Sequence, residues 1–295
     1  MRDGNGLTGI EGFDDGHEER LWAPWRMRYV GGHREPGCVF CNRLAGHDDP
    51  QSLILWRGEH AFAIMNLFPY NTGHIMLAPN DHAAGPEEAD PRALAEMALT
   101  MPSILRALRR ALNCDGFNLG ANVGGIAGAG IASHLHEHIV PRWAGDANFM
   151  PILASTMVMP ELIPVTYAKL RAEIAREPGA PARFPVAVTW AAGERVLADA
   201  QGRLPTAEAS PDEPLWRAAI RLAQAVAPDR TLDVVWAGSE SAIGMTALGI
   251  SADWLPEDRA SWIGPAEFTD PVDQAVANRA VWMAQRVHQG RTPDR

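Results

Sequence analysis

Three histidines, His134, His136 and His138, occupy every second position of one short stretch of the chain. Alternate side chains of a β-strand share a face and lie about 7 Å apart along it, so a strand over residues 134–141 would align the three rings. A buried imidazole needs a polar partner, which makes such a row unusual in a core. Metal binding and phosphate chemistry are the two functions that it suits.

A glycine-rich segment, Gly116–Ser133, leads directly into these histidines. Glycine lets main-chain N–H groups approach an anion closely, and such a loop can wrap around a phosphate chain. A glycine-rich loop alone is weak evidence, but one that continues into three histidines on one face is strong evidence. The combination predicts a site that handles phosphates.

These residues resemble the signature of the histidine triad (HIT) superfamily of nucleotide hydrolases and transferases. The surrounding sequence is similar to a bacterial branch of that superfamily, which includes the diadenosine tetraphosphate phosphorylases (ATP adenylyltransferases). The resemblance covers about residues 20–176. The segments that carry it are Leu21–Val30, Cys38–Cys41, Asn66–His74, Gly116–Asn122 and His134–Trp143.

His136 is the candidate nucleophile, and the resemblance assigns the same role to the middle histidine of the triad. Imidazole attacks an α-phosphorus readily at neutral pH and forms a nucleotidyl-histidine intermediate, which a second acceptor then resolves. His138 would bind a phosphate oxygen or protonate the leaving group. Glu137 departs from the HIT pattern, which usually has an apolar residue there. On a buried face it would need a partner, whereas at a dimer edge it would be harmless.

Cys38 and Cys41 form a Cys-x-x-Cys pair, which we expect to lie in a loop. With histidines nearby in a cytosolic chain, such a pair is more often a metal site than a redox pair, and a metal-free pair is the alternative. Some HIT branches complete a tetrahedral zinc site with two histidines, whose positions match His82 and His134. The resemblance thus implies a structural zinc ion and no organic cofactor. Cys114 is expected to be a small core residue.

Several further residues are candidates for substrate binding because they match segments that line the HIT nucleotide site. Asn66 is the candidate for the ribose hydroxyls, while His74 is either a ligand of the nucleotide or a structural histidine. Asn122 would orient the phosphates, and Arg142 would neutralise their charge or form a surface ion pair. Main-chain N–H groups would also bind the phosphates, at Gly128, Ala129, Gly130 and Ile131.

The composition is that of a globular protein with a real core, with 46% hydrophobic and 21% charged residues. A net charge of −10 excludes a broad nucleic-acid-binding surface. The first residues have no signal-peptide core, and no apolar run approaches about 18 residues, so we expect no membrane association. Three cysteines do not make a disulfide framework, which predicts a cytoplasmic protein. The HIT resemblance implies a homodimer.

Strand-rich sequence around one long helix predicts an α+β sheet domain. The HIT resemblance implies that its sheet is antiparallel and of the HIT type. We expect a flexible tail at residues 1–20, the HIT domain at 21–176, a linker at 177–183 and a smaller α/β domain at 184–295. Pro102 should kink or split the long helix. The elements expected in the HIT domain are strands at 53–56, 61–65, 74–78, 117–122 and 134–141 and helices at 91–112 and 160–176.

In the second domain, strands are expected at 184–190, 195–200 and 232–237, and helices at 215–226 and 272–287. This part faintly resembles the opening of a Nudix hydrolase. A Nudix enzyme binds magnesium through several glutamates, and the corresponding stretch, Leu215–Gln224, contains none. A Nudix-like domain here would therefore be degenerate. An α/β appendage that serves oligomerisation or covers the pocket is an equally good interpretation.

The row of histidines and the HIT resemblance together imply a nucleotidyl transferase or hydrolase that acts on dinucleoside polyphosphates through His136. Phosphate as second acceptor would make it a phosphorylase, and water would make it a hydrolase. One alternative is a HIT hydrolase of nucleoside phosphoramidates or adenylylated conjugates. An alternative of another class is a non-catalytic nucleotide-binding or scaffold protein, because a fold does not by itself determine a function.

Overall fold

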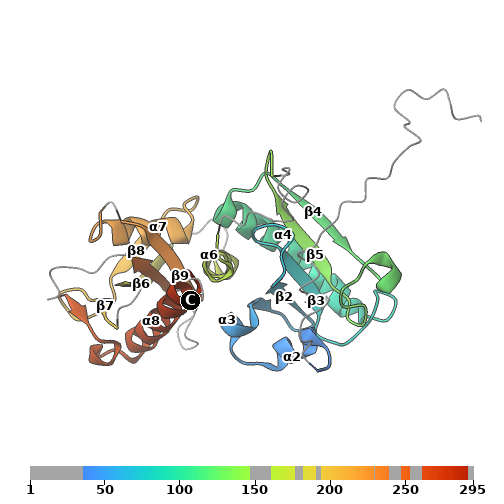
Figure 1. The fold of residues 1–295 in the computed structure, drawn as a ribbon, viewed down its shortest axis with the longest axis horizontal. Coiled ribbons are helices and arrows are strands. Elements are labelled where there is room, and N and C mark those ends of the chain that lie inside the picture. Colours follow the sequence, from blue (N-terminus) through green and yellow to red (C-terminus); the bar gives the residue numbers. More distant parts are fainter. Residues whose placement is uncertain are drawn as a thin grey trace, which may run out of the picture. The chain divides into compact units, whose positions relative to one another are not determined.

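The computed structural model of the chain describes residues 36–146, 161–176, 182–190, 194–228, 230–238, 247–252 and 261–291. All of these ranges belong to one compact unit, which spans residues 34–146 and 159–295. The expected tail and most of the expected linker lie outside the described residues. Figure 1 shows the elements in their chain order.

The first sheet has five antiparallel strands in the order β1-β2-β3-β5-β4. A HIT-type antiparallel sheet with helices was predicted, and the sheet confirms it. Short helices α2 (Val39–Ala45) and α3 (Asp49–Ser52) precede it. The strands are β1 (Ile54–Arg57), β2 (Ala61–Met65), β3 (Ile75–Pro79), β4 (Gly116–Ala121) and β5 (Glu137–Arg142).

Helix α4 (Pro91–Leu112) covers one face of this sheet and begins with a capping hydrogen bond from the main-chain N–H of Arg92 to the Asp90 carboxylate. The helix continues through Pro102, so the expected split does not occur. Buried residues before and after this proline pack into the core and hold the helix together, among them Met97 and Ile104. The opposite face of the sheet packs against Phe40 of α2 and also carries the histidines.

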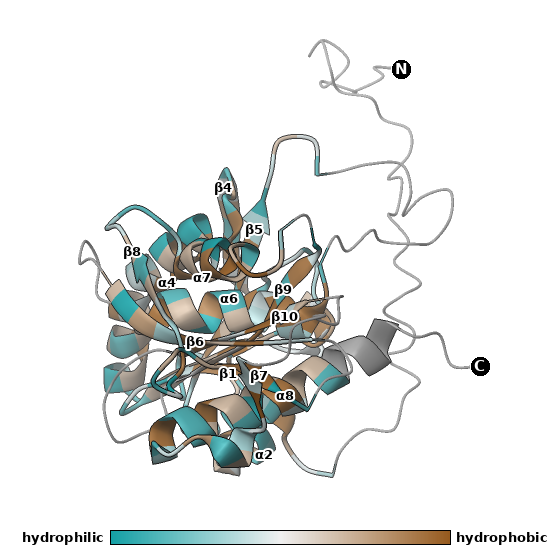
Figure 2. Ribbon diagram, turned by 90° about the vertical axis from the view of Figure 1, so that its left-hand side faces the viewer, coloured by the Kyte–Doolittle hydropathy of each residue, from teal (hydrophilic) through white to brown (hydrophobic). Residues whose placement is uncertain are grey.

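The second sheet has the strand order β8-β6-β10-β9, with β10 parallel to β6, which agrees with the expected α/β region. Strands β6 and β10 are mostly apolar and buried (Figure 2). Only residues 196–197 of the strand expected at 195–200 form one, and β8, β10 and β11 were not predicted. The elements are β6 (Ala182–Trp190), β7 (Val196–Leu197), β8 (Thr206–Ala209), α7 (Leu215–Gln224), β9 (Leu232–Gly238), β10 (Ala247–Ala252), β11 (Trp262–Ile263), η2 (Pro265–Glu267) and α8 (Pro271–Arg291).

Helix α6 (Ile163–Ala175) contributes to the cores of both sheets. Its Tyr167 packs in the core of the first sheet, and its Ala168 packs in the core of the second. Glu173 is buried and accepts hydrogen bonds from the Arg110 guanidinium of α4 and from the main-chain N–H of Leu215 in α7, each at 2.7 Å. A buried carboxylate needs such partners, and these tie three helices together. Among the described helices, none is long and apolar enough to span a membrane.

Candidate active site and metal site

The triad lies at the start of β5 rather than along it. The expected strand at 134–141 begins only at Glu137, so that prediction was wrong at its N-terminal end. The register pairs Leu77 of β3 with Glu137, and continuing it would set Pro79 opposite Leu135. Proline has no N–H to donate to the ladder, and the main-chain N–H of Leu135 donates instead to the carbonyl of Ala83. The residues just before Glu137 therefore do not continue the pairing of β5 with β3.

His136 is buried, and its Nδ1 lies 2.8 Å from the main-chain carbonyl oxygen of His134. A carbonyl can only accept a hydrogen bond, so Nδ1 carries the proton and donates it. Burial lowers the pKa of His136, while the hydrogen bond to the carbonyl opposes that shift. The ring is thus neutral at pH 7, and its Nε2 has the free electron pair that a nucleophile needs.

His138 is oriented by a second chain of hydrogen bonds. The main-chain N–H of Tyr70 donates to Nδ1 of His74 at 3.1 Å, and the Asn66 amide lies 3.3 Å from the same nitrogen. His74 Nδ1 is therefore an acceptor, which leaves the proton of this ring on Nε2. That Nε2 lies 2.9 Å from Nδ1 of His138, so it donates there, and a neutral His138 then carries its own proton on Nε2.

His74 is completely buried, and its burial and the neighbouring His138 and His136 lower its pKa to about 3. It therefore stays neutral over the pH range in which exposed histidines become charged. Of the two roles expected for His74, this geometry favours the structural one, because both ring nitrogens are used inside the protein. Tyr70, whose ring lies 4.7 Å from that of His74, was not identified from the sequence.

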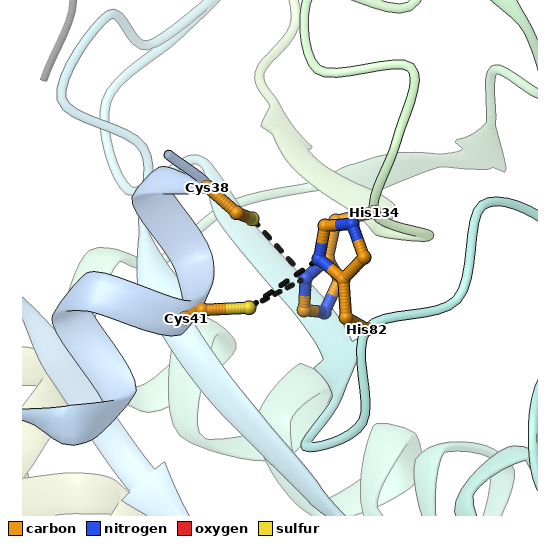
Figure 3. Close-up of side chains that lie close together, drawn as sticks. All are labelled: Cys38, Cys41, His82 and His134. Carbon is orange, nitrogen blue, oxygen red and sulfur yellow. Dashed lines mark hydrogen bonds between the residues drawn. The ribbon is translucent and has the colours of Figure 1, made fainter. Parts of the chain in front are cut away.

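Cys38, Cys41, His82 and His134 form a compact cluster in which all four ligand atoms lie within 4.8 Å of one another (Figure 3). The Cys38 and Cys41 sulfurs lie 3.3 and 3.7 Å from Nδ1 of His134, and the Cys41 sulfur lies 3.4 Å from Nδ1 of His82. Bond lengths of about 2.3 Å to sulfur and 2.05 Å to nitrogen put tetrahedral zinc ligands about 3.5 Å apart. The donor set and its spacing thus fit zinc.

Two details of the surroundings support this fit. Nε2 of His134 lies 2.9 Å from the carbonyl oxygen of Pro79, so it donates its proton there and Nδ1 faces the cysteines unprotonated. The cysteine pair also differs from the expected loop, because Cys38 is the N-cap of α2 and Cys41 lies in its first turn. A helix sets both sulfurs on one side, as Figure 3 shows. Cys114 is buried in the core, as predicted.

The remaining candidate residues lie in varied surroundings. The Asn66 carbonyl oxygen accepts a hydrogen bond from the main-chain N–H of Phe68. Asn122 is half-buried directly after β4, and the loop that follows contains the short helix η1 (Gly125–Ala127). Of the phosphate-binding candidates in this loop, Gly128 and Gly130 are exposed, and Ala129 and Ile131 are half-buried.

Arg142 and Glu137 were singled out with alternatives left open. The Arg142 guanidinium contacts both carboxylate oxygens of Asp146 at 2.6 Å and the Asn118 side chain at 2.7 Å. This is the surface ion pair that was one of its two expected roles. Glu137 is half-buried, and burial raises the pKa of its carboxyl group.

A family model for the HIT domain matches residues 49–145. An AP-4-A phosphorylase from Mycobacterium tuberculosis is 35% identical over 168 residues, which cover 54% of this chain and 86% of that protein. Adenylylsulfatase HINT3 from Arabidopsis thaliana is 33% identical over 37% of this chain and 57% of its own length. A zinc-bound histidine triad family protein from Mycobacterium smegmatis has a TM-score of 0.39 and 28% identity, over 47% of this chain and 94% of its own.

The chain belongs to the histidine triad (HIT) family. Its sheet, its buried histidines and its similarity to the mycobacterial phosphorylase together support a nucleotide-processing enzyme. The comparisons leave the second acceptor, phosphate or water, open.

His74→Gln should reduce the dependence of stability on pH. The unfolded chain takes up a proton on His74 near pH 6.5, whereas the folded protein does so only near pH 3. The wild-type protein therefore loses stability as pH falls through this window, by about 1.4 kcal/mol per pH unit from this residue. Urea unfolding of both proteins between pH 4.5 and 7.5 measures the difference. Parallel plots of unfolding free energy against pH for the two proteins would contradict the lowered pKa of His74.

Proposed function

We propose that this chain transfers the nucleoside monophosphate part of a dinucleoside polyphosphate, such as diadenosine tetraphosphate, through His136. The observation that carries the proposal is the hydrogen bond from Nδ1 of His136 to the carbonyl of His134, which leaves a neutral Nε2 as nucleophile. The relative named AP-4-A phosphorylase supports this substrate class.

In the first step, Nε2 of His136 attacks the α-phosphorus and the bond from that phosphorus to the bridging oxygen breaks. His138, which stays neutral, donates a hydrogen bond from its Nε2–H to this oxygen and so stabilises the charge that the departing polyphosphate gains. The product is a nucleotidyl-histidine. In the second step, the acceptor attacks the same phosphorus and the bond from phosphorus to Nε2 of His136 breaks, which releases the neutral imidazole. A phosphate acceptor is already an anion, and the proton lost by a water acceptor passes to solvent.

The substrate contacts are proposals of the same kind. We assign Asn66 to the ribose hydroxyls and Asn122 to the phosphates. The main-chain N–H groups at Gly128, Ala129 and Gly130 would bind the phosphates as well. Arg142 would add positive charge at the end of β5, after rearrangement of its ion pair with Asp146. His74 would act by holding His138.

Incubation with diadenosine tetraphosphate, with and without inorganic phosphate, tests this function. ADP and ATP formed only with phosphate would establish phosphorolysis, and AMP and ATP would establish hydrolysis. His136→Ala should lower turnover by at least about 1000-fold, because nothing replaces the nucleophile. His47→Ala, at an exposed histidine outside the site, is the control and should keep full activity.

The competing functions give different results in the same assay. A phosphoramidate or adenylylated conjugate hydrolase would release AMP from adenosine phosphoramidate or adenylyl sulfate and leave the dinucleotide intact, and the relative named adenylylsulfatase makes this the second candidate. A non-catalytic scaffold would bind the nucleotides and convert none. Survival of full activity in His136→Ala would refute the proposed nucleophile.

We further propose that Cys38, Cys41, His82 and His134 bind a structural zinc ion, which would cross-link the N-terminal segment to the chain before β5. Purified protein should contain about one zinc per chain by mass spectrometry of the metal. Cys38→Ser should lose it, whereas Cys114→Ser, at a buried cysteine outside the cluster, should retain it. Equal zinc content in the two variants would contradict the site.

A homodimer through β4 is the assembly that we propose. β4 is an edge strand of the first sheet, its last four residues are exposed, and the Leu119 side chain there is 47% exposed. An exposed edge strand pairs readily with a second chain. The wild type should have a solution mass of about 64 kDa, twice 32.0 kDa. Leu119→Lys should yield the monomer, and Leu99→Lys, on the surface of α4, should not; a dimeric Leu119→Lys would refute this interface.

The other proposals concern the whole chain. We retain a cytoplasmic location and the division into a HIT domain up to residue 176 and a second domain from residue 184. The faint Nudix resemblance of that second part stays a prediction. Its α7 carries no glutamate, so we assign it no metal chemistry.

A further inference from the structure

Phe40 lies between the two cysteines of the cluster and contacts the catalytic segment. Its side chain is 1% exposed, and its ring centroid lies 5.1 Å from that of His134 and 5.0 Å from that of His136. These are ordinary distances for packed aromatic rings. No role for Phe40 follows from the sequence pattern, because an apolar residue between two metal-binding cysteines has no chemistry of its own.

The nucleophile needs a contact of this kind. The single hydrogen bond to the His134 carbonyl holds one edge of the His136 ring. It fixes Nδ1, but the tilt of the ring about that bond decides where Nε2 points, and this tilt depends on the rings packed against His136, those of Phe40 and His138. A ring packed against the imidazole restricts this tilt and helps to keep water away from Nδ1. Phe40 is placed to do both.

The metal cluster holds Phe40 in turn. Helix α2 has only seven residues, and a helix this short is not stable by itself. Cys38 and Cys41 bracket Phe40 on this helix, and both contact Nδ1 of His134. A metal bound by these three residues would therefore fix the helix, and with it Phe40, against the segment that bears the nucleophile.

We propose that Phe40 is a positioning residue for His136, through which the Cys/His cluster acts on the transfer reaction. This inference rests on the proposed function for its kinetic consequence. The competing interpretation is that Phe40 is only a core residue, because it also packs against the buried Phe62 at a centroid distance of 6.2 Å.

Phe40→Leu and Phe62→Leu separate the two interpretations. Both variants remove a buried aromatic ring from the same hydrophobic cluster, but of these two rings only that of Phe40 has a described contact with the histidines. Phe40→Leu should lower kcat for diadenosine tetraphosphate at least about tenfold, with KM within about twofold and zinc content unchanged. Phe62→Leu should keep kcat within about twofold. Equal kcat losses in both variants, or none in either, would overturn the proposal.

A nuclear magnetic resonance measurement tests Phe40 without any substrate. Correlations between ring carbon-bound protons and ring ¹⁵N show which nitrogen of His136 is protonated, with the His136→Gln variant identifying its signals. Wild type and Phe62→Leu should show one tautomer with the proton on Nδ1, and Phe40→Leu a mixture. An unchanged His136 tautomer in Phe40→Leu would refute the positioning role.

The kinetic assay and the tautomer measurement distinguish failure of the proposed function from failure of the role of Phe40. Wild-type protein without turnover would refute the proposed function, whereas the tautomer result would still decide the role of Phe40. If Phe40→Leu does not fold, Phe40→Met offers a side chain of similar size without the aromatic face, with Phe62→Met as its partner, and the same results are expected.

Discussion

Two hydrogen bonds between imidazole rings and the main chain determine which nitrogens of the active-site histidines are protonated. The His134 carbonyl can only accept, so it holds the proton of His136 on Nδ1. The Tyr70 N–H can only donate, so it keeps Nδ1 of His74 unprotonated and turns the proton of that ring toward His138. As a result, the ring of His136 has an unprotonated Nε2, and the neighbouring ring of His138, whose centroid lies 4.9 Å away, has a protonated one.

These hydrogen bonds determine the tautomers because the histidine rings are buried. In water an imidazole exchanges its two tautomers and becomes charged below about pH 6.5. Desolvation lowers the pKa values of His74, His134 and His136, so these rings stay neutral and each must use one nitrogen as donor and the other as acceptor. The apolar side chains around them thus have a chemical effect as well as a packing one.

Much of this could be predicted from the sequence, because the signals were local. The helix at 91–112 was predicted to the residue from its apolar period and its ends. The cysteine pair of the cluster was identified from its spacing, and its two histidines from the HIT resemblance. The residue at which β5 begins was not predicted. It depends on Pro79, which comes to lie opposite Leu135 only in the folded chain. Phe40 and Tyr70 escaped notice for a similar reason. Phe40 contacts histidines that are distant in the chain, and the residue types of Phe40 and Tyr70 do not indicate a role in the site.

The donor to His74 is a peptide group, and this has a consequence for how the chain can vary. Any amino acid at position 70 supplies the same N–H, so the proton order of His74 and His138 survives replacement of the tyrosine side chain. Proline alone would abolish this N–H, because its nitrogen bears no hydrogen. Pro69 at the preceding position does not disturb this hydrogen bond, because the donor to the His74 ring is the nitrogen of residue 70. A shift of proline by one residue along this loop would therefore remove this donor and leave the Asn66 amide as the group that holds Nδ1 of His74 unprotonated.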